Sequence, residues 1–325
     1  MAKINRIGVL TSGGDAPGMN AAIRAVTRTA IYNNIEVYGI NRGYEGMIEG
    51  DFVKLQSKDV SGIIQKGGTI LKTARSARFR TPEGRQEAYE NLTKFELDGI
   101  VVIGGDGSFT GASILSQEFG IPVVGIPGTI DNDLYGTDYT IGYDTCLNTV
   151  VDAVDKIRDT ASSHNRIFFV EVMGRDAGFV ALEGGIATGA EVIMIPEVKN
   201  QMVELRQFLS ERAKSNRSSI IVVAEGDDEG SAIEIAARVQ PEFPQFDIRV
   251  TILGHIQRGG SPSCYDRVSA SRLGVAAVEA LLDDQKSIMV GIVHGQVVHV
   301  PLSKTVKTHK GVPKNLLDVA HVLAI

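Results

Sequence analysis

Five short segments of the chain combine glycines with residues that can bind phosphate or move a proton. They are TSGGDAPGMN at 11–20, GGDGS at 104–108, PGTIDND at 127–133, EVMGRDAG at 171–178 and LGHIQRGGSP at 253–262. Each belongs to the end of an apolar, β-branched run or follows it directly. Backbone N–H groups in a glycine-rich turn that opens a helix can approach phosphate oxygens. The pattern favours a site for a phosphorylated ligand, built from loops at strand ends.

The first two segments offer backbone groups and one carboxylate. Segment 11–20 lacks the Gly-Lys-Ser/Thr ending of a Walker A loop and is not GxGxxG, so a plain strand-to-helix turn remains the alternative. In segment 104–108, Asp106 stands between glycines, where a carboxylate can hold Mg²⁺ that bridges nucleotide phosphates. A helix N-cap is the alternative for Asp106.

Two further carboxylates, Asp131 and Asp133, lie two residues apart in segment 127–133. In an extended segment both side chains point to the same side. One can accept a proton from an attacking hydroxyl while the other helps to bind a metal ion. A solvated acidic turn is the alternative, because Asn and Asp are common turn formers.

Basic residues follow later strands. Arg175 lies just past a strand end, where a guanidinium can neutralise charge on a transferring phosphoryl group. His255 and Arg258, flanked by glycines, suit a phosphate or sugar site; a surface arginine and a structural histidine are the alternatives. Three more arginines near strand or loop ends are Arg75, Arg166 and Arg249. Singly each fits a salt bridge, and together they suit an anionic substrate.

Alternating strand and helix patterns must position these residues. Apolar runs predict strands at 6–11, 99–104, 121–126, 166–173, 191–195, 219–225, 247–253 and 288–293. Helical patterns cover 18–33, 108–119, 145–162, 203–213 and 262–282. Alternation of this kind predicts an α/β fold of two doubly wound, Rossmann-like lobes with largely parallel sheets and a cleft between them. Ligands then bind beyond the carboxyl ends of the strands. The Arg-rich stretch 75–85 is expected to be a mobile, charged loop.

Composition excludes several classes of protein. The chain has 325 residues, 43% hydrophobic, and a net charge of -6, which disfavours a nucleic-acid or anionic-membrane binder. Cys146 and Cys264 have no metal or redox spacing, and a reducing compartment fits them. No apolar run reaches the roughly 18–20 residues that span a bilayer, and no signal peptide is evident. We therefore expect a cytoplasmic protein.

The segments TSGGDAPGMNAAIR, GGDGS, PGTIDND, GTDYTIG, EVMGRDAG and LGHIQRGGSP, in this order, resemble the bacterial ATP-dependent 6-phosphofructokinases (phosphofructokinase family A). The resemblance runs from about Arg6 to the final helix. It implies transfer of the γ-phosphoryl group of ATP to the 1-hydroxyl of D-fructose 6-phosphate, a step of glycolysis, by a homotetramer. It also implies an ATP-binding lobe and a sugar-phosphate-binding lobe, at residues 1–141 with 256–305 and 142–255 with 306–325 respectively.

The resemblance assigns a role to each matched residue. Asp131 is the expected general base, and Thr129 and Arg175 are expected to stabilise the transferring group. Asp106 and Asp133 are expected to serve Mg²⁺. The expected ATP contacts are Gly14, Arg75, Ser76, Gly105, Asp106, Gly107 and Ser108. The expected sugar-phosphate contacts are Thr129, Asp131, Met173, Gly174, Arg175, Glu225, His255 and Arg258, with Arg166 and Arg249 reaching the 6-phosphate from a neighbouring subunit.

Two glycines indicate the phosphoryl donor. Pyrophosphate-using relatives carry Asp where this chain has Gly107 and Lys where it has Gly128. An Asp side chain would crowd and repel the α-phosphate region of ATP, and a Lys would supply charge for pyrophosphate. We therefore expect ATP to be the donor.

An effector site for ADP or phosphoenolpyruvate is also implied by the resemblance. The matching residues are Arg24, Arg28, Arg158 and Glu191, and Arg217 lies next to a position where the relatives carry a lysine. Charged residues of the relatives fall here at Ser57 and Asn216, so we expect an altered or weak effector response.

Three alternatives remain. A lipid or NAD kinase would explain GGDG but not PGTIDND, MGR or GHIQRGGSP. A pyrophosphate-dependent phosphofructokinase would have other residues at 107 and 128. A catalytically silent regulatory subunit would be expected to lack Asp131 or Arg175, and both are present.

Overall fold

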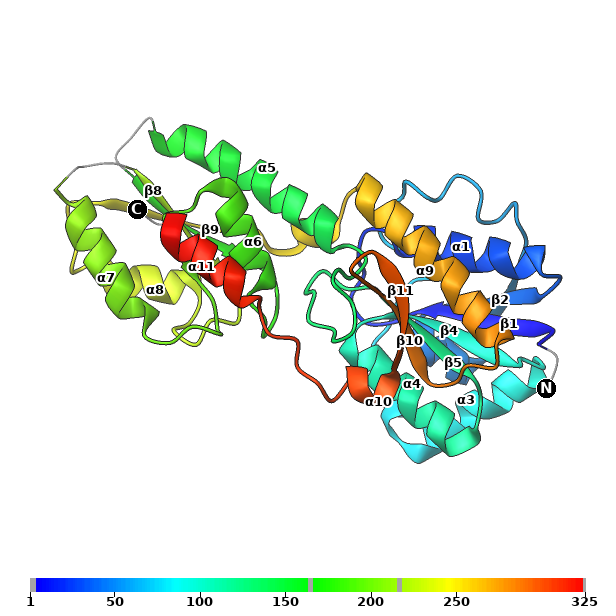
Figure 1. The fold of residues 1–325 in the computed structure, drawn as a ribbon. Coiled ribbons are helices and arrows are strands. Elements are labelled where there is room, and N and C mark those ends of the chain that lie inside the picture. Colours follow the sequence, from blue (N-terminus) through cyan, green and yellow to red (C-terminus); the bar gives the residue numbers. More distant parts are fainter. Residues whose placement is uncertain (1–3, 163–165, 215–217, 324–325) are drawn as a thin grey trace. The chain divides into compact units, whose positions relative to one another are not determined.

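A computed structural model describes residues 4–162, 166–214 and 218–323 (Figure 1). The chain forms two compact units, each with its own sheet. Unit 1 contains residues 1–129, 134–145 and 258–310, and unit 2 contains residues 130–133, 146–257 and 311–325. The ligand of each unit and the lobe boundaries inferred from the resemblance stay predictions.

Unit 1 is built on a seven-stranded sheet of order β11-β10-β5-β4-β1-β2-β3. Its strands are β1 (Arg6–Thr11), β2 (Glu36–Ile40), β3 (Phe52–Leu55), β4 (Gly99–Gly104), β5 (Val123–Pro127), β10 (Ile288–Val293) and β11 (Gln296–Pro301). The pairs β2–β3 and β10–β11 are antiparallel, and the other neighbours are parallel. Every residue of β4 is buried, as expected for a central strand covered on both faces.

Helices cover both faces of this sheet. They are α1 (Met19–Tyr32), α2 (Gly43–Glu49), α3 (Pro82–Lys94), α4 (Asp106–Phe119), α9 (Cys264–Leu282) and α10 (Leu302–Thr305), with a 3₁₀ turn at Arg78–Arg80. In Figure 1, α1 and α9 lie on one face, and α3, α4 and α10 lie on the other. Small residues allow α1 and α9 to pack closely, since a Cβ atom on Gly274 would lie 2.5 Å from the Cβ of Ala25.

Unit 2 contains a four-stranded parallel sheet of order β7-β8-β6-β9. The strands are β6 (Arg166–Val172), β7 (Val192–Met194), β8 (Ser219–Ala224) and β9 (Asp247–Ile252). The helices are α5 (Tyr143–Ser162), whose first three residues belong to unit 1, α6 (Phe179–Thr188), α7 (Gln201–Arg212), α8 (Ala232–Val239) and α11 (Lys314–Leu323). Side chains of α7 and α8 form an apolar core with β6 and β8. A second 3₁₀ turn spans Gly254–Arg258.

The predicted fold class is confirmed, and the expected strands and helices are present within about two residues of their predicted ends. The expectation for 75–85 was partly wrong. Phe79 is buried, Thr81 caps α3 through the N–H of Gly84, and Pro82 occupies the first turn of that helix. Only the beginning of the stretch is irregular loop.

No helix among the described residues is long and apolar enough to cross a membrane.

Candidate active site

The carboxyl ends of β1, β4 and β5 lie side by side in the sheet of unit 1. The chain passes from β1 to β2 on one side and later returns to β4 on the other side of β1. This reversal is a topological switch point, where open α/β sheets bind their ligands. The segments 11–20, 104–108 and 127–133 follow these three strands. The sheet therefore brings the first three glycine-rich segments to one edge.

The turn after β1 is closed by contacts to β4 and to a distant arginine. The backbone N–H of Ser12 donates to the carbonyl of Ile103 (3.0 Å), which joins the two strand ends. Arg258 donates from Nη1 to the carbonyl of Asp15 (3.3 Å). A Cβ on Gly14 would lie 2.3 Å from that Nη1, so the glycine allows the guanidinium to lie against the turn. Arg258, predicted to contact the sugar phosphate, is thus placed beside Gly14, predicted to contact ATP.

The turn after β4 presents the N-terminus of α4. Gly105 is extended, and Asp106, Gly107 and Ser108 form the first turn of the helix, in which the N–H of Ser108 donates to the carbonyl of Gly105 (3.0 Å). A Cβ on Gly104 would lie 2.6 Å from the hydroxyl of Ser108, so packing requires that glycine. A Cβ on Gly107 would meet no described atom within 4 Å. The fold does not demand glycine at 107, and a ligand that approaches the helix closely would explain it.

Thr129 is buried, and both its backbone N–H and its carbonyl are hydrogen-bonded. Its N–H donates to the carbonyl of Ile141 (3.1 Å), and its carbonyl accepts from the hydroxyl of Thr140 (2.6 Å). A Cβ on Gly105 would lie 3.5 Å from the Cβ of Thr129, which places the threonine next to the turn after β4. Asp131, two residues further on, is buried and belongs to the part of the chain that packs with unit 2.

The carboxylate of Asp106 suits magnesium bound together with phosphate. Asp106 is half-buried at the start of α4, and Asp133 is also half-buried. The described ranges contain no cluster of three or more His, Cys, Asp or Glu that would hold a metal ion by themselves. Mg²⁺ is commonly held by one or two carboxylates, with waters and substrate phosphates completing its coordination. Asp106, at the start of the helix that is expected to bind phosphate, fits such an ion by its chemistry.

The loop that carries Arg75 is anchored at its far end. The hydroxyl of Ser76 accepts from the N–H of Phe79 (3.1 Å), and the Phe79 ring stacks on Tyr44 with centroids 4.0 Å apart. Arg75 itself is exposed. Ser76 therefore has a structural partner within its own loop, and Arg75 remains available to a ligand.

In unit 2, the carboxyl end of β6 carries a turn that is held by side chains from other strands. The N–H of Met173 donates to Oε1 of Gln257 (3.2 Å), which is fully buried. Oε1 of Glu225, at the end of β8, accepts from the N–H groups of Gly174 (3.4 Å) and Arg175 (2.8 Å). The backbone of this turn is therefore fixed while the side chain of Arg175 is 66% exposed.

Arg175 adopts a left-handed backbone conformation, with φ of 56°. Such a conformation is uncommon for a residue other than glycine and is found preferentially at functional sites. A Cβ on Gly226 would lie 2.0 Å from the carbonyl oxygen of Arg175, so only glycine allows the loop after β8 to pack here. His255 is exposed beyond the end of β9. Because β8, β6 and β9 are adjacent, Glu225, Arg175 and His255 follow neighbouring strand ends.

Arg166 and Arg249 are not part of this edge. Arg166 begins β6, roughly 20 Å from the other end of the strand at ~3.3 Å per residue. Asp247 accepts from Nε of Arg166 (2.8 Å), and its other oxygen lies 2.9 Å from Nε of Arg249. The hydrogen bond from Arg166, with that from Arg249, lowers the pKa of Asp247. The two arginines form a cluster at the amino end of the sheet.

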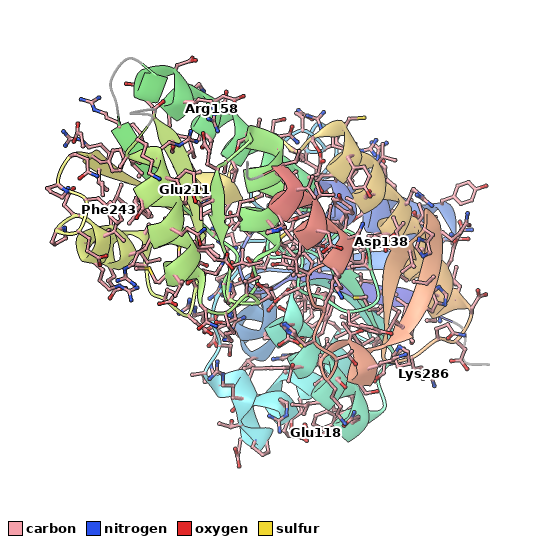
Figure 2. The ribbon with its side chains drawn as sticks, turned by 60° about the vertical axis from the view of Figure 1, so that its left-hand side comes forward. Glu118, Asp138, Arg158, Glu211, Phe243 and Lys286 are labelled. Atoms are coloured by element: carbon pink, nitrogen blue, oxygen red, sulfur yellow. The ribbon has the colours of Figure 1, made fainter. Side chains whose placement is uncertain are left out.

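Two of the residues expected at an effector site come together in unit 2. Arg158, labelled on α5 in Figure 2, places Nη1 3.6 Å from Oε1 of Glu191. Its Nη2 donates to the carbonyls of Thr188 and Gly189, each at 2.8 Å. Arg212, which belongs to none of the sequence motifs, lies 3.5 Å from the same Glu191 oxygen. In the sequence, Arg212 could be noticed only as a basic residue in the last turn of a helix.

The other expected effector residues lie elsewhere. Arg24 and Arg28 are one turn apart on α1 in unit 1, and burial together with the charge of Arg28 lowers the pKa of Arg24. Nε of Arg28 is buried without an acceptor among the described residues. Arg217 falls outside the described residues.

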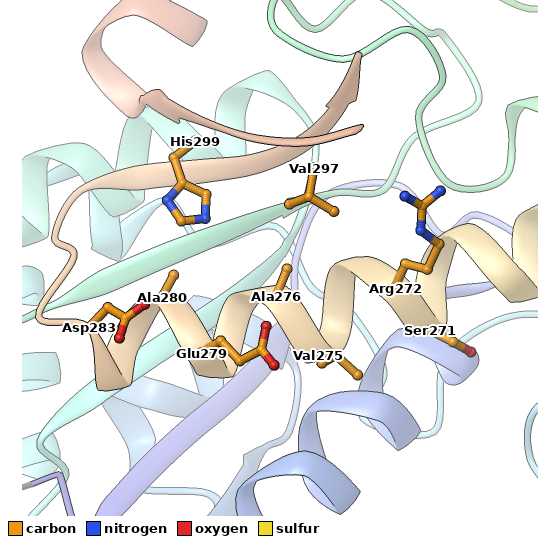
Figure 3. Close-up of a pocket in the computed structure, with 9 residues that line it drawn as sticks. All are labelled: Ser271, Arg272, Val275, Ala276, Glu279, Ala280, Asp283, Val297 and His299. Carbon is orange, nitrogen blue, oxygen red and sulfur yellow. The ribbon is translucent and has the colours of Figure 1, made fainter. Parts of the chain in front are cut away.

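Unit 1 contains a pocket of about 630 Å³ (Figure 3). It is an open groove between α9 and β11, lined by Ser271, Arg272, Val275, Ala276, Glu279, Ala280, Asp283, Val297 and His299. None of the predicted site residues lines it. We assign no catalytic role to this groove.

Comparisons with known proteins agree with the motifs. The profile of the family "Phosphofructokinase" matches residues 6–281. ATP-dependent 6-phosphofructokinase 2 of Bacteroides thetaiotaomicron is 59% identical, over 100% of both chains. ATP-dependent 6-phosphofructokinase 1 of Thermus thermophilus is 56% identical, over 99% of this chain and 100% of the relative.

A solved structure of phosphofructokinase from Saccharomyces cerevisiae superposes with a TM-score of 0.89 at 39% identity. It covers 99% of this chain, which spans about half (48%) of the yeast chain. The match to the family profile and the full-length relatives lead to one conclusion: the chain belongs to the phosphofructokinase family.

Proposed function

We propose that this protein is an ATP-dependent 6-phosphofructokinase that converts D-fructose 6-phosphate and ATP into fructose 1,6-bisphosphate and ADP. The observation that carries the proposal is the set of glycine-rich turns after β1, β4 and β5, with Thr129 fixed beside the N-terminus of α4. The names of full-length relatives at 56–59% identity support the same reaction.

In the proposed mechanism, unit 1 binds the nucleotide. N–H groups in the first turn of α4 and the turn at Gly14 bind phosphate oxygens, and Arg75 adds positive charge. Asp106 and Asp133 would hold Mg²⁺, which neutralises phosphate charge when it is bound. The open space at Gly107 supports ATP as the donor, because the phosphates can approach the helix closely.

A second set of residues binds the sugar phosphate and acts on its hydroxyl group. Asp131 accepts the proton of the 1-hydroxyl as that oxygen attacks the γ-phosphorus. Thr129 and Arg175 stabilise the charge on the transferring group. The fixed backbone of Arg175 supports this role, since a preorganised donor needs little reorganisation during the reaction. Met173, Gly174, Glu225, His255 and Arg258 contact the sugar phosphate.

The assembly and regulation form part of the same proposal. Arg166 and Arg249 lie at the opposite end of their sheet from Arg175, which supports their action on a neighbouring subunit in a homotetramer. ADP or phosphoenolpyruvate would bind at the basic residues of α1 and at the cluster of Arg158 and Glu191. The buried, unpaired Nε of Arg28, within the described part of the chain, supports an anion there. A cytoplasmic location is also proposed.

The test is a coupled assay with fructose 6-phosphate and Mg²⁺, run in parallel with ATP and with pyrophosphate. We expect turnover with ATP alone, and we expect Asp131→Ser to lower kcat by at least about 10²-fold while it still binds ATP, because it removes a proton acceptor. Turnover with pyrophosphate alone would overturn the donor assignment. Absence of turnover with both donors would overturn the proposed reaction, and an unchanged kcat in the variant would overturn the assigned base.

A further inference from the structure

The first turn of α9 carries a carboxyl group that the proposed mechanism does not use. Asp266 is fully buried in unit 1. Its Oδ1 accepts from the N–H of Gly142 (2.8 Å), and its Oδ2 accepts from the N–H (2.8 Å) and the hydroxyl (2.5 Å) of Thr145. Burial raises the pKa of Asp266, against the opposing effect of these hydrogen bonds. One side chain thus holds a segment more than 120 residues away in sequence, as the separations of 124 and 121 show.

A second layer of hydrogen bonds joins the same two helix N-termini. The N–H of Ser263 donates to the hydroxyl oxygen of Thr145 (2.9 Å), and the hydroxyl of Ser263 donates to Asp144 (2.5 Å). The Ser263 hydroxyl also accepts from the N–H of Asp266 (3.2 Å), as the N-cap of α9. The start of α5 is therefore tied to the start of α9 by a connected polar network, whose buried members have partners.

The segment that Asp266 holds leads directly to Thr129. The N–H of Ile141 donates to the carbonyl of Pro127 (2.9 Å), and the carbonyl of Ile141 accepts from the N–H of Thr129 (3.1 Å). The neighbouring hydroxyl of Thr140 donates to the carbonyl of Thr129 (2.6 Å). Residues 140–141 therefore hold the backbone of Thr129. Asp266 in turn holds the residues that follow them, Gly142 and Thr145.

Packing leaves this segment little freedom. Gly142 has φ of 101°, and a Cβ there would lie 2.6 Å from the Cβ of Ala16. Gly18, at the start of α1, is equally crowded, since its Cβ would lie 2.6 Å from the Ile141 side chain and 3.6 Å from the Cβ of Asp266. The segment is therefore packed between the start of α1 and the start of α9, and a shift at Asp266 must be transmitted along it.

We propose that Asp266 is a positioning residue for phosphoryl transfer: it fixes segment 140–145 and thereby sets the place of the Thr129 backbone. This inference rests on the proposed function, in which Thr129 stabilises the transferring group. An interaction made only in the transition state affects kcat, and it leaves ground-state binding of the substrates nearly unchanged. Displacement of Thr129 therefore lowers kcat without a matching rise in KM.

Asp266→Asn tests the proposal with almost no change of volume. An amide NH₂ replaces one acceptor oxygen, so a donor faces either the N–H of Gly142 or the N–H of Thr145. We expect kcat to fall about ten- to a hundredfold, with KM for ATP and for fructose 6-phosphate within about twofold of the original value. We also expect faster amide hydrogen exchange in residues 127–145 of the folded variant. A kcat within about twofold of the original, or unchanged exchange in that segment, would overturn the proposal.

Asp98→Asn is the matched control in the same unit. Oδ2 of Asp98 accepts from the N–H groups of Asn5 (2.7 Å) and Arg6 (3.0 Å), so it too binds two backbone donors of a distant segment. It lies at the amino ends of β1 and β4, away from Thr129. We expect its kcat to be unchanged. A loss equal to that of Asp266→Asn would show a general effect on stability and would count against positioning.

A second pair of variants covers the case in which Asp266→Asn does not fold. Thr145→Val removes the hydroxyl that donates to Asp266, and Thr145→Ser restores it. We expect kcat to fall in the valine variant and to recover in the serine variant, with KM unchanged in both. Equal kcat values would overturn the proposal. If the unaltered protein shows no phosphofructokinase activity, the proposed function fails, whereas the exchange comparison still decides whether Asp266 fixes residues 127–145.

Discussion

Gly107 and Gly128 both follow strands of the same sheet, but the space around the two positions differs. A side chain at Gly107 would meet open space, whereas a Cβ at Gly128 would lie 3.2 Å from Cγ2 of Ile103 and 3.3 Å from Cε of Met19. Packing of the described residues disfavours a side chain at 128 and tolerates one at 107. Of the two positions that indicate the donor, 107 can therefore be changed without a cost in folding.

Gly107→Asp is predicted to weaken ATP binding without loss of stability. A carboxylate in the first turn of α4, next to Asp106, repels the phosphates that we expect to bind there. We expect KM for ATP to rise at least about tenfold, equivalent to ~1.4 kcal/mol, in steady-state kinetics, with Tm unchanged. Gly107→Asn has the same shape without the charge and is the control. An equal rise of KM in both variants would assign the effect to bulk, and no rise in either would remove position 107 from the donor site.

An ion pair between α3 and α4 helps to order segment 75–85. Arg85 on α3 donates from Nε (2.6 Å) and Nη2 (2.7 Å) to Glu118 on α4, which Figure 2 labels. Nη1 of the same arginine donates to the carbonyls of Phe79 (3.2 Å) and Arg80 (2.8 Å). Arg85 is buried, and its two-pronged contact is the strong form of such a pair. The pair fixes the 3₁₀ turn that follows Arg75 and Ser76.

Glu118→Gln is predicted to destabilise unit 1 in a pH-dependent way. The hydrogen bond from Arg85 lowers the pKa of Glu118 below its ordinary value of 4.5, so its stabilising contribution is complete above pH 4.5 and is lost as the pH falls through the folded-state value. We expect denaturant unfolding at pH 7 to show a loss of about 1–2 kcal/mol, and the loss to shrink below pH 4.5. Glu279→Gln, on exposed α9 surface, is the control. A loss that did not depend on pH would contradict the role of the charged pair.

In the assembled protein, the arginine cluster at the amino end of β6 could bind substrate in the active site of its own chain or in that of a neighbouring subunit. Arg166, Arg249 and Asp247 are held together there, while Arg175 lies at the other end of the sheet. A rigid parallel sheet cannot bring its two ends to one small ligand. The geometry of a single chain therefore supports a shared site in the proposed homotetramer.

Mixing of two inactive variants tests this sharing. Arg166→Ala and Asp131→Ala each lose activity if both residues serve the reaction. If Arg166 acts across an interface, a site is intact when the Arg166 variant supplies Asp131 and the Asp131 variant supplies Arg166. Random reassociation of equal amounts of the two variants therefore restores about a quarter of the sites. We expect this recovery in a coupled assay after dissociation and mixing, and none when either variant is treated alone. No recovery in mixed tetramers confirmed by mass spectrometry would show that Arg166 acts within its own chain.

Local sequence patterns predict most of the elements and the turns that carry the chemistry. Continuous apolar runs such as 99–104 and 219–224 are buried on both faces, and this requires parallel strands covered by helices. Polar and glycine-rich segments at the ends of such runs then mark the ligand edge. The strands β2, β3 and β11 were not predicted, because β2 is only half apolar and β3 and β11 are antiparallel edge strands.

The side chains that hold these turns come from distant segments and could not be predicted from the sequence. Gln257 meets Met173 across 84 residues of sequence, and Asp266 meets Gly142 across 124. No local sequence pattern indicates either contact, because both contacts depend on the order of the strands and on which helix N-termini are adjacent. Arg85 was predicted to lie in a charged loop, although it is buried, because its partner Glu118 is also distant in sequence. Periodicity records local burial, whereas the partner of a buried polar group is fixed by packing between distant segments.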